Sequence, residues 1–234
     1  MIYKIGLELE GGSYATESET KRMLAPFCQG VGEDGSLMGL ETDYVYEVKL
    51  LFTLSSFQDF SCKLKDYWSS SGFKQNESCG NHLHFSFRPR ENGLALAWLY
   101  GEFLKEYKQV FGGLGDKYIN RLNNGYCRGD FNLQVYFKQL WYNYKDGSRY
   151  FALNYNCYRP FKTVEVRVLP WASSPDELIE SISKMINLVK KYTTKEAIKV
   201  ARKRYEHYIN EPATIIKKAG FNVSRTEEIY GNDL

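Results

Sequence analysis

Two glutamates separated by one residue are the first positions able to do chemistry. Glu8 and Glu10 lie in a run of alternating apolar and polar residues, and glycines flank the pair. Residues two apart on a β-strand project from the same face, so the two carboxylates repel each other unless a cation lies between them. Hard ions such as Mg²⁺ prefer carboxylate oxygens, and the glycines allow close approach to the backbone. The pair indicates a metal site or, taken alone, an ordinary solvated strand face.

Two of the three histidines form the second candidate. His82 and His84 stand two apart in the segment 79–86, and therefore share one face of a predicted strand. Such a pair suits metal binding and phosphate contact equally well. The simpler alternative is a pair of structural histidines, which the neighbouring glycine and serine make the less favoured interpretation.

The third and fourth candidates combine charges of opposite sign. Glu165 and Arg167 also stand two apart. They can simply pair with each other, or the arginine can offer its fixed fork of donors to phosphate oxygens. The fourth candidate is a turn at residues 34–37 followed by Glu47 and Lys49 on the next predicted strand. The turn sequence alone indicates only a turn.

The alternation of residue types predicts the strands that carry these side chains. Each has one apolar face and one ionic face; in the first, Tyr3, Ile5 and Leu7 oppose the glutamates. Such strands suit an antiparallel sheet that helices cover on one side and leave open on the other. Acids and basic groups converging on the open face fit phosphoryl chemistry on two metal ions. The predicted strands span residues 3–11, 44–51, 82–88 and 163–169.

Helix signals account for the covering layer. Ser174, Pro175 and Glu177 predict a capping box that opens a long helix. The other predicted helices begin at Ser55 or Ser56, cover residues 93–111, and run from Thr193 to about Tyr208, whereas residues 112–145 mix short helices with loops. We therefore expect an α+β fold with a catalytic domain at residues 1–192 and a C-terminal helix and polar tail at 193–234.

Composition limits the classes of protein that remain. The 234 residues are 43% hydrophobic and 16% aromatic, with a net charge of +3, which is too small to imply nucleic acid by itself. Five cysteines with no CxxC pair favour reduced thiols over a disulfide framework or a zinc finger. No basic-then-apolar leader is present, and no apolar run approaches the roughly 18–20 residues needed to cross a bilayer. We expect a cytoplasmic protein without a membrane partner.

Five motifs in a fixed order resemble the amidoligase family, within the larger group of carboxylate–amine ligases that includes glutamine synthetase and glutamate–cysteine ligase. The motifs are IGLELE at 5–10, EDGSL at 33–37, EVK at 47–49, CGNHLHFSF at 79–87 and TVEVRVL at 163–169. The resemblance implies a curved antiparallel sheet of glutamine-synthetase-like type, with the active site on its open concave face. It also implies that ATP binds there with two or more Mg²⁺ or Mn²⁺ ions. A substrate carboxylate would take the γ-phosphate, and an amine would then displace phosphate from the acyl phosphate.

The resemblance also implies roles for individual residues. The expected metal ligands are Glu8, Glu10, Glu47, His82 and Glu165. The expected nucleotide-binding residues are His82, Lys49, Arg121 and Asn154. The expected catalytic residues are Arg167, Arg149 and His84. The acid and the amine stay open, as a small molecule or a peptide.

Three other functions remain open at this stage. The same sheet could serve a guanidino or amine phosphotransferase, which would leave a stable phosphorylated acceptor. It could also be a catalytically inactive scaffold for a nucleotide, nucleic acid or protein partner, although the basic residues of the last helix are better explained as a solvated face. Metal-dependent hydrolysis ranks lower, because the arginine and the several carboxylates suit a nucleotide better than one activated water. The basic residues of that helix are Lys199, Arg202, Lys203 and Arg204, and the pair Lys217 and Lys218 in the tail would extend the basic surface.

Overall fold

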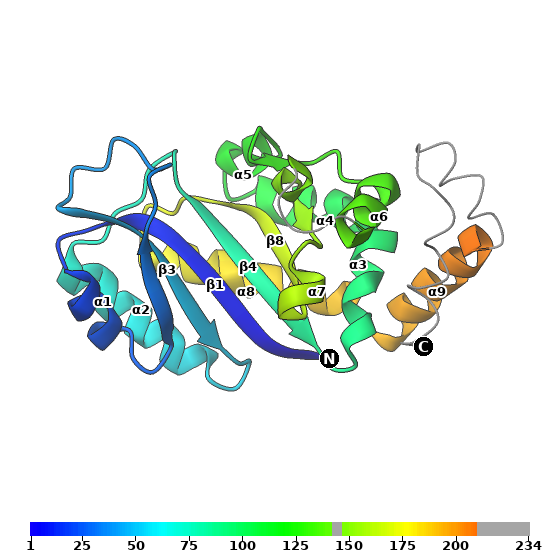
Figure 1. Cartoon of the computed structure of the whole chain (residues 1–234), viewed down its shortest axis with the longest axis horizontal. Coiled ribbons are helices and arrows are strands. Elements are labelled where there is room, and N and C mark those ends of the chain that lie inside the picture. Colours follow the sequence, from blue (N-terminus) through cyan, green and yellow to red (C-terminus); the bar gives the residue numbers. More distant parts are fainter. Residues whose placement is uncertain (142–146, 210–234) are drawn as a thin grey trace.

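Six antiparallel strands form one sheet at the centre of the protein. The computed structural model describes residues 1–141 and 147–209 (Figure 1). The sheet order is β2-β3-β1-β4-β8-β7, so strands far apart in the sequence are hydrogen-bonded neighbours. The expected α+β class with an antiparallel sheet is confirmed. The strands are β1 (Ile2–Ser13), β2 (Cys28–Glu33), β3 (Tyr44–Phe52), β4 (Gly80–Phe87), β7 (Leu153–Asn154) and β8 (Thr163–Pro170).

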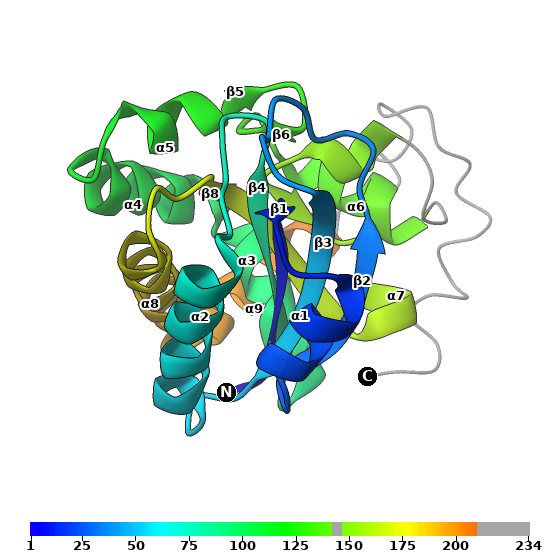
Figure 2. The ribbon, with the colours of Figure 1, turned by 90° about the vertical axis from the view of Figure 1, so that its left-hand side faces the viewer.

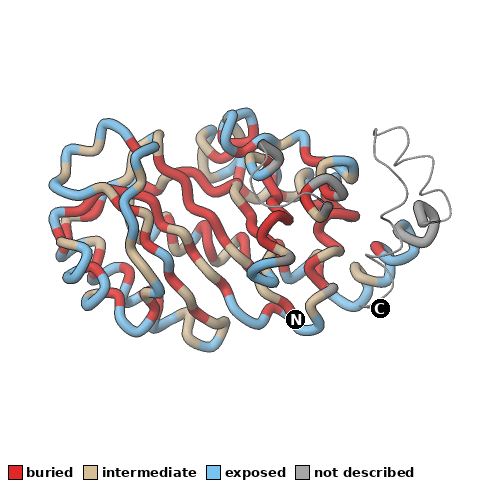
Figure 3. The backbone as a smooth tube through the Cα atoms, viewed as in Figure 1, coloured by how far each residue is buried: buried red, intermediate tan, exposed pale blue. Residues whose placement is uncertain are grey.

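One face of the sheet forms the hydrophobic core. Three helices lie along this face, α2 (Phe57–Ser71), α4 (Tyr100–Gly112) and α8 (Pro175–Tyr192) (Figure 2). The central strands run through the most buried part of the molecule (Figure 3). Burying a large apolar side chain contributes about 1.5–3 kcal/mol, so this layer fixes the strands in place. Its buried strand residues include Leu7, Leu9, Val48, Leu50, Leu83, Phe85, Val164, Val166 and Val168.

Local signals set the ends of the covering helices. The Ser174 hydroxyl accepts a hydrogen bond from the backbone N–H of Glu177 at 3.2 Å, and Pro175 occupies the first helical position of α8. The expected capping box is incomplete, because the Glu177 carboxylate accepts from the N–H of Ser173, at 2.8 Å, one residue before the cap. Helix α2 ends at Gly72, whose φ of 60° places it in the left-handed region that favours glycine.

The expected orientation of Tyr3 is wrong. Tyr3 is 41% exposed, whereas its neighbour Ile2 is buried. The pairing of β1 with β4 shifts register between Ile2 and Lys4. A bulge of this kind adds one residue to a strand, and the side chains before it then project from the opposite faces.

The single helix predicted at residues 93–111 is also wrong. The segment folds as a 3₁₀ turn, η1 (Arg90–Leu94), the short helix α3 (Ala95–Trp98), and α4, with the break at Leu99, whose φ and ψ are −106° and 20°. The break turns the chain so that α3 packs against α9 (Lys195–Ile209) while α4 packs against α8. Two packing surfaces therefore replace the one that a continuous helix would offer.

The remaining elements are short. The predicted mixture of short helices and loops between 112 and 141 is confirmed, with α5 (Asp116–Arg121) and α6 (Leu133–Trp141) separated by a small hairpin. The expected polar tail, with Lys217 and Lys218, lies outside the described residues. Within those residues, the helices are all too short or too polar to cross a membrane. The other elements are α1 (Glu17–Met23), β5 (Asn123–Asn124), β6 (Cys127–Arg128), η2 (Gly147–Tyr150) and α7 (Tyr158–Phe161).

The bulge in β1 can be tested by truncating residues on either side of it. Leu7→Ala removes a side chain that is 1% exposed, and should lower the free energy of unfolding by about 2–5 kcal/mol. Tyr3→Ala removes surface contacts with the Arg88 guanidinium, 3.6 Å from the ring centroid, and with Lys4 Nζ at 5.4 Å, and should cost about 1 kcal/mol or less. Urea denaturation measures both changes. A loss at Tyr3 as large as that at Leu7 would place the tyrosine in the core and contradict the bulge.

Candidate metal centre

The face of the sheet opposite the core gathers ionic side chains from neighbouring strands. In the register of the sheet, Glu8 on β1 lies opposite His82 on β4 and opposite Lys49 on β3. Two residues further along β1, Glu10 lies opposite Glu47 of β3. The strand order, rather than closeness in sequence, therefore brings these groups together. On the other side of β4, His84 lies opposite Glu165 of β8, which in turn lies opposite Asn154 of β7.

His82 is the central residue of this cluster. Its Nδ1 lies 3.1 Å from Glu8 Oε2 and 3.5 Å from Glu165 Oε1. Its Nε2 lies 3.8 Å from Glu10 Oε1 and has no hydrogen-bond partner, although the side chain is only 5% exposed. A buried imidazole nitrogen without a partner is unfavourable in water-free surroundings, and is well suited to contact a cation.

Glu165 is the most enclosed carboxylate of the cluster. It accepts a hydrogen bond from Asn154 Nδ2 at 2.6 Å and forms an ion pair with Arg167. Burial raises the pKa of Glu165. The positive charges of Arg167 and the two histidines lower it by a larger amount, so the net shift is downward. The carboxylate therefore stays ionised inside the protein.

Glu8 and His84 stabilise each other's charged forms. His84 Nε2 lies 3.2 Å from Glu8 Oε1. Burial raises the pKa of Glu8, whereas the adjacent His82 and His84 rings lower it by more, which holds the pKa well below its usual range. Burial lowers the pKa of His84, but Glu8 and Glu165 raise it by more. In the metal-free protein the His84 imidazole therefore supplies positive charge to Glu8.

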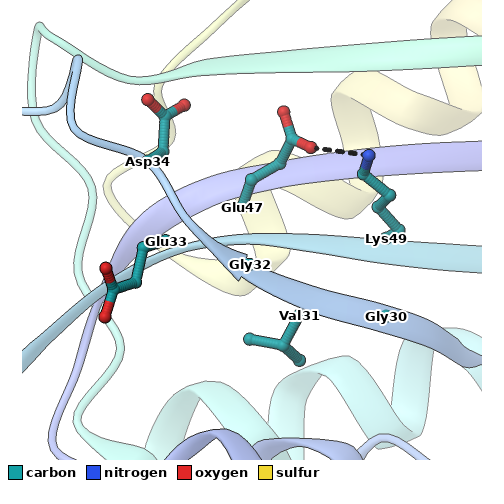
Figure 4. A pocket seen from close by; sticks show the side chains of 7 residues that line it. All are labelled: Gly30, Val31, Gly32, Glu33, Asp34, Glu47 and Lys49. Atoms are coloured by element: carbon teal, nitrogen blue, oxygen red, sulfur yellow. Dashed lines mark ion pairs between the residues drawn. The ribbon is translucent and has the colours of Figure 1, made fainter.

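A second group of carboxylates lies at the other end of the cluster. One oxygen from each of Glu10, Asp34 and Glu47 lies within 4.8 Å of the others. Asp34 and Glu47 line an open pocket of about 330 Å³, in which both project to the same side while Glu33 points away (Figure 4). Burial raises the pKa of Glu47, and the charge of Glu8 raises it further, although Lys49 Nζ lies 3.2 Å from its carboxylate. Burial and the neighbouring Glu8 therefore both disfavour the ionised form of Glu47.

The two glutamates of β1 thus belong to two different sets of candidate ligands. Glu8 joins His82 and Glu165, whose ligand atoms also lie within 4.8 Å of one another, whereas Glu10 joins the all-carboxylate set. Oxygen-rich sets of this kind fit Mg²⁺ or Mn²⁺, and an imidazole fits Mn²⁺. The unpartnered His82 Nε2 and the raised pKa of Glu47 both agree with a cation at this face.

Of the three arginines expected at the site, two lie beside the cluster. Arg167 pairs with Glu165, and its Nε donates to the Tyr126 carbonyl at 3.3 Å.

Arg121 is buried against Gly80. A Cβ atom added at this glycine would lie 2.0 Å from Arg121 Nη2 and 3.1 Å from His82 Nε2. A glycine is therefore needed for this guanidinium to approach the histidine.

Arg149 contacts the aromatic ring of its neighbour. It is exposed, and its guanidinium carbon lies 4.7 Å from the centroid of the Tyr150 ring, whose hydroxyl accepts its hydrogen bond. The same ring lies 6.0 Å from the Arg167 guanidinium carbon. In the part of the chain that the structure describes, no ion pair joins Arg149 to the carboxylate cluster.

Two residues of the cluster were not among the expected site residues. Asp34 lies in the EDGSL motif, so the sequence did single out its position. The motif was interpreted as a turn, and the Asp34 carboxylate does accept a hydrogen bond from the Ser36 N–H at 2.9 Å. Cys157 donates its thiol to Glu165 Oε2 at 3.4 Å. Its sequence spacing gives no signal, because the loop after β7 brings it to the site.

The fold and the site define an α+β protein with a candidate binuclear metal centre on the polar face of an antiparallel sheet. Comparison with known proteins adds no relative: no family model, no curated protein and no solved structure gives a significant match. Function therefore has to be inferred from the side chains on this face and from the motifs they form.

The pKa of Glu47, raised by burial and by Glu8, predicts a pH-dependent gain of stability in Glu47→Gln. A carboxyl whose folded pKa is raised binds more protons in the folded state, so unfolding becomes easier as the pH rises above its ordinary value of 4.5. After a chelator has removed any metal, the variant should therefore be more stable than the wild-type protein at neutral pH. This difference in stability should shrink below about pH 4.5. Thermal unfolding across this range measures it, with Glu33→Gln as the matched control. A difference that grows on acidification would contradict the assignment.

Manganese should stabilise the folded protein through Glu10. At a concentration one hundred times its dissociation constant, a ligand that binds only the folded state adds about 2.7 kcal/mol. Glu10→Gln removes one ligand and should shift the Mn²⁺ midpoint of thermal stabilisation at least tenfold upward, whereas Glu33→Gln should leave the midpoint unchanged. Equal midpoints in both variants would exclude Glu10 as a ligand.

Proposed function

We propose that this protein is an ATP-dependent carboxylate–amine ligase that uses two divalent cations on a sheet of glutamine-synthetase-like type. The observation that carries the proposal is the division of Glu8 and Glu10 between two adjacent ligand sets. Phosphoryl transfer commonly uses two neighbouring ions to hold the phosphate oxygens. The order of the five motifs, and their resemblance to amidoligases, support ligation as the outcome of that transfer.

Each set would have its own task. Glu8, His82 and Glu165 would hold one Mg²⁺ or Mn²⁺ ion, and the all-carboxylate set would hold the other. The bound ions would neutralise charge on the nucleotide phosphates. A fully oxygen-donating set is the better match to Mg²⁺, whereas the imidazole of His82 extends the first set toward Mn²⁺.

The basic side chains would act on the transferred group. Arg167 is held in place by Glu165 and the Tyr126 carbonyl, which fixes the direction of its guanidinium. A preorganised cation is most effective where negative charge develops in the transition state. Arg121 and Lys49 would contact phosphate oxygens from either side of the cluster, Asn154 orients Glu165, and His84 orients Glu8.

The reaction would proceed in two displacements. A carboxylate oxygen of the acid substrate attacks the γ-phosphorus, the bond to the β-phosphate oxygen breaks, and ADP and an acyl phosphate result. The amine nitrogen then attacks the acyl carbon, phosphate leaves, and the nitrogen loses a proton as the amide forms. Small molecules and peptides both offer suitable acids and amines.

Calorimetric titration of ATP, with and without Mg²⁺, tests the nucleotide site. Binding should require Mg²⁺ and should weaken at least tenfold in Glu8→Gln and in Arg167→Ala, since each variant removes a charge from the same face. Arg88→Ala is the charge-matched control, because that guanidinium stacks on exposed Tyr3 at the opposite end of β4 and should not affect binding.

Product analysis with pairs of acids and amines then separates the enzyme classes. An amide with free phosphate supports ligation, whereas a stable phosphorylated acceptor would assign the site to a phosphotransferase. Unchanged ATP binding in both Glu8→Gln and Arg167→Ala would remove the nucleotide from this face. Absence of ATP binding to the wild-type protein, together with salt-sensitive binding of nucleic acid, would favour an inactive scaffold.

A further inference from the structure

The thiol of Cys157 adds a soft ligand to a cluster that is otherwise made of oxygen and nitrogen. Cys157 is 6% exposed and directs its sulfur at the buried carboxylate of Glu165. A ring nitrogen of His84, the sulfur, and a Glu165 oxygen all lie within 4.8 Å of one another. This third set differs from the other two, because thiolate and imidazole ligands favour Zn²⁺ over Mg²⁺.

We propose that Cys157, His84 and Glu165 form a binding site for a thiophilic divalent cation of the zinc class, which shares Glu165 with one of the two oxygen-rich sets. The inference does not rest on ligase activity, because the site needs no nucleotide. Three protein ligands leave one position of a tetrahedral ion open to solvent or to a substrate.

The distance between sulfur and oxygen fits an ion of this size. Ligands at about 2.3 Å (sulfur) and about 2.1 Å (oxygen) from a tetrahedral ion lie about 3.6 Å apart. Cys157 Sγ and Glu165 Oε2 lie 3.4 Å apart, with the thiol proton between them. On binding, the thiol releases this proton to solvent and the ion takes its position, so the S–H bond is replaced by a bond from sulfur to the metal.

The two edges of the Glu165 carboxylate face different neighbours. Oε1 faces His82 and Arg167, whereas Oε2 faces Asn154 and Cys157. A single carboxylate can therefore contribute one oxygen to the oxygen-rich set and the other to the thiol set. This arrangement would make the two sites adjacent but chemically distinct.

Supporting hydrogen bonds hold the soft ligands in position. Asn154 Nδ2 donates to Glu165 Oε2 at 2.6 Å and lies 3.8 Å from Cys157 Sγ. Asn154 Oδ1 accepts from the N–H of Asn156 at 3.0 Å, and this turn returns the chain from β7 toward β8.

The His84 ring is also held from one side. Its Nδ1 lies 3.4 Å from the Thr163 hydroxyl, and its Nε2, which faces Glu8, is buried without a hydrogen bond of good geometry. Partners of this kind are typical of metal ligands.

Titration of Co²⁺ into the metal-free protein tests the site by absorption spectroscopy. One equivalent should produce a thiolate-to-cobalt charge-transfer band, which Zn²⁺ abolishes by displacement and which excess Mg²⁺ leaves in place. Cys157→Ser should remove the band and weaken Zn²⁺ binding at least about tenfold. Cys62→Ser is the matched control, since that thiol is exposed on α2, on the other side of the sheet.

Two results would overturn the proposal. One is a charge-transfer band that persists in Cys157→Ser or disappears in Cys62→Ser, and the other is Co²⁺ binding to the wild-type protein without a thiolate band. If Cys157→Ser prevents folding, as judged by circular dichroism, His84→Gln carries the test with the cysteine intact. Unchanged Co²⁺ and Zn²⁺ affinities in that variant would likewise exclude the site.

Discussion

Repulsion between carboxylates on a partly buried sheet face is the constraint on which the rest of the structure depends. Two like charges 4 Å apart repel by about 4 kcal/mol at the effective dielectric typical of a protein surface. Glu8, Glu10, Glu47 and Glu165 occupy neighbouring strands, and His82 lies among them as the residue that contacts three of the four. His84 and Arg167 compensate part of this charge, and the helices on the opposite face hold the strands that force the groups together. At Glu47, burial and the charge of Glu8 together raise the pKa.

The period of two along each strand made much of this face predictable. Alternation in the segments around Glu8, Glu47, His82 and Glu165 was enough to assign each side chain to the polar face, because residues two apart cannot lie on opposite faces without a bulge. The antiparallel class followed from the same pattern. Strand order could not be derived in this way, since the pairing of β1 with both β3 and β4 is a property of the folded sheet.

The features that the sequence did not predict have local causes, which a periodic pattern of residue types does not report. The bulge near Ile2 exchanges the faces of one strand end, and the break at Leu99 divides a helix that contains no proline. Cys157 reaches Glu165 only because a turn at Asn154 reverses the chain, so its role depends on backbone geometry rather than on spacing. Arg149, placed by resemblance, donates to the hydroxyl of its neighbour Tyr150, and its expected catalytic role stays a prediction.

The position of β2 at the edge of the sheet gives the two oxygen-rich sets unequal rigidity. Glu8, His82 and Glu165 stand on three inner strands, and β7 pairs with β8 at Glu165 itself. Glu10 and Glu47 also stand on inner strands, whereas Asp34 follows the edge strand, where small local openings are expected to be more frequent. We therefore expect the first set to be organised before any ion arrives, whereas Asp34 can close on its ion afterwards. The sheet itself would then impose an order of loading, with the inner set filled first.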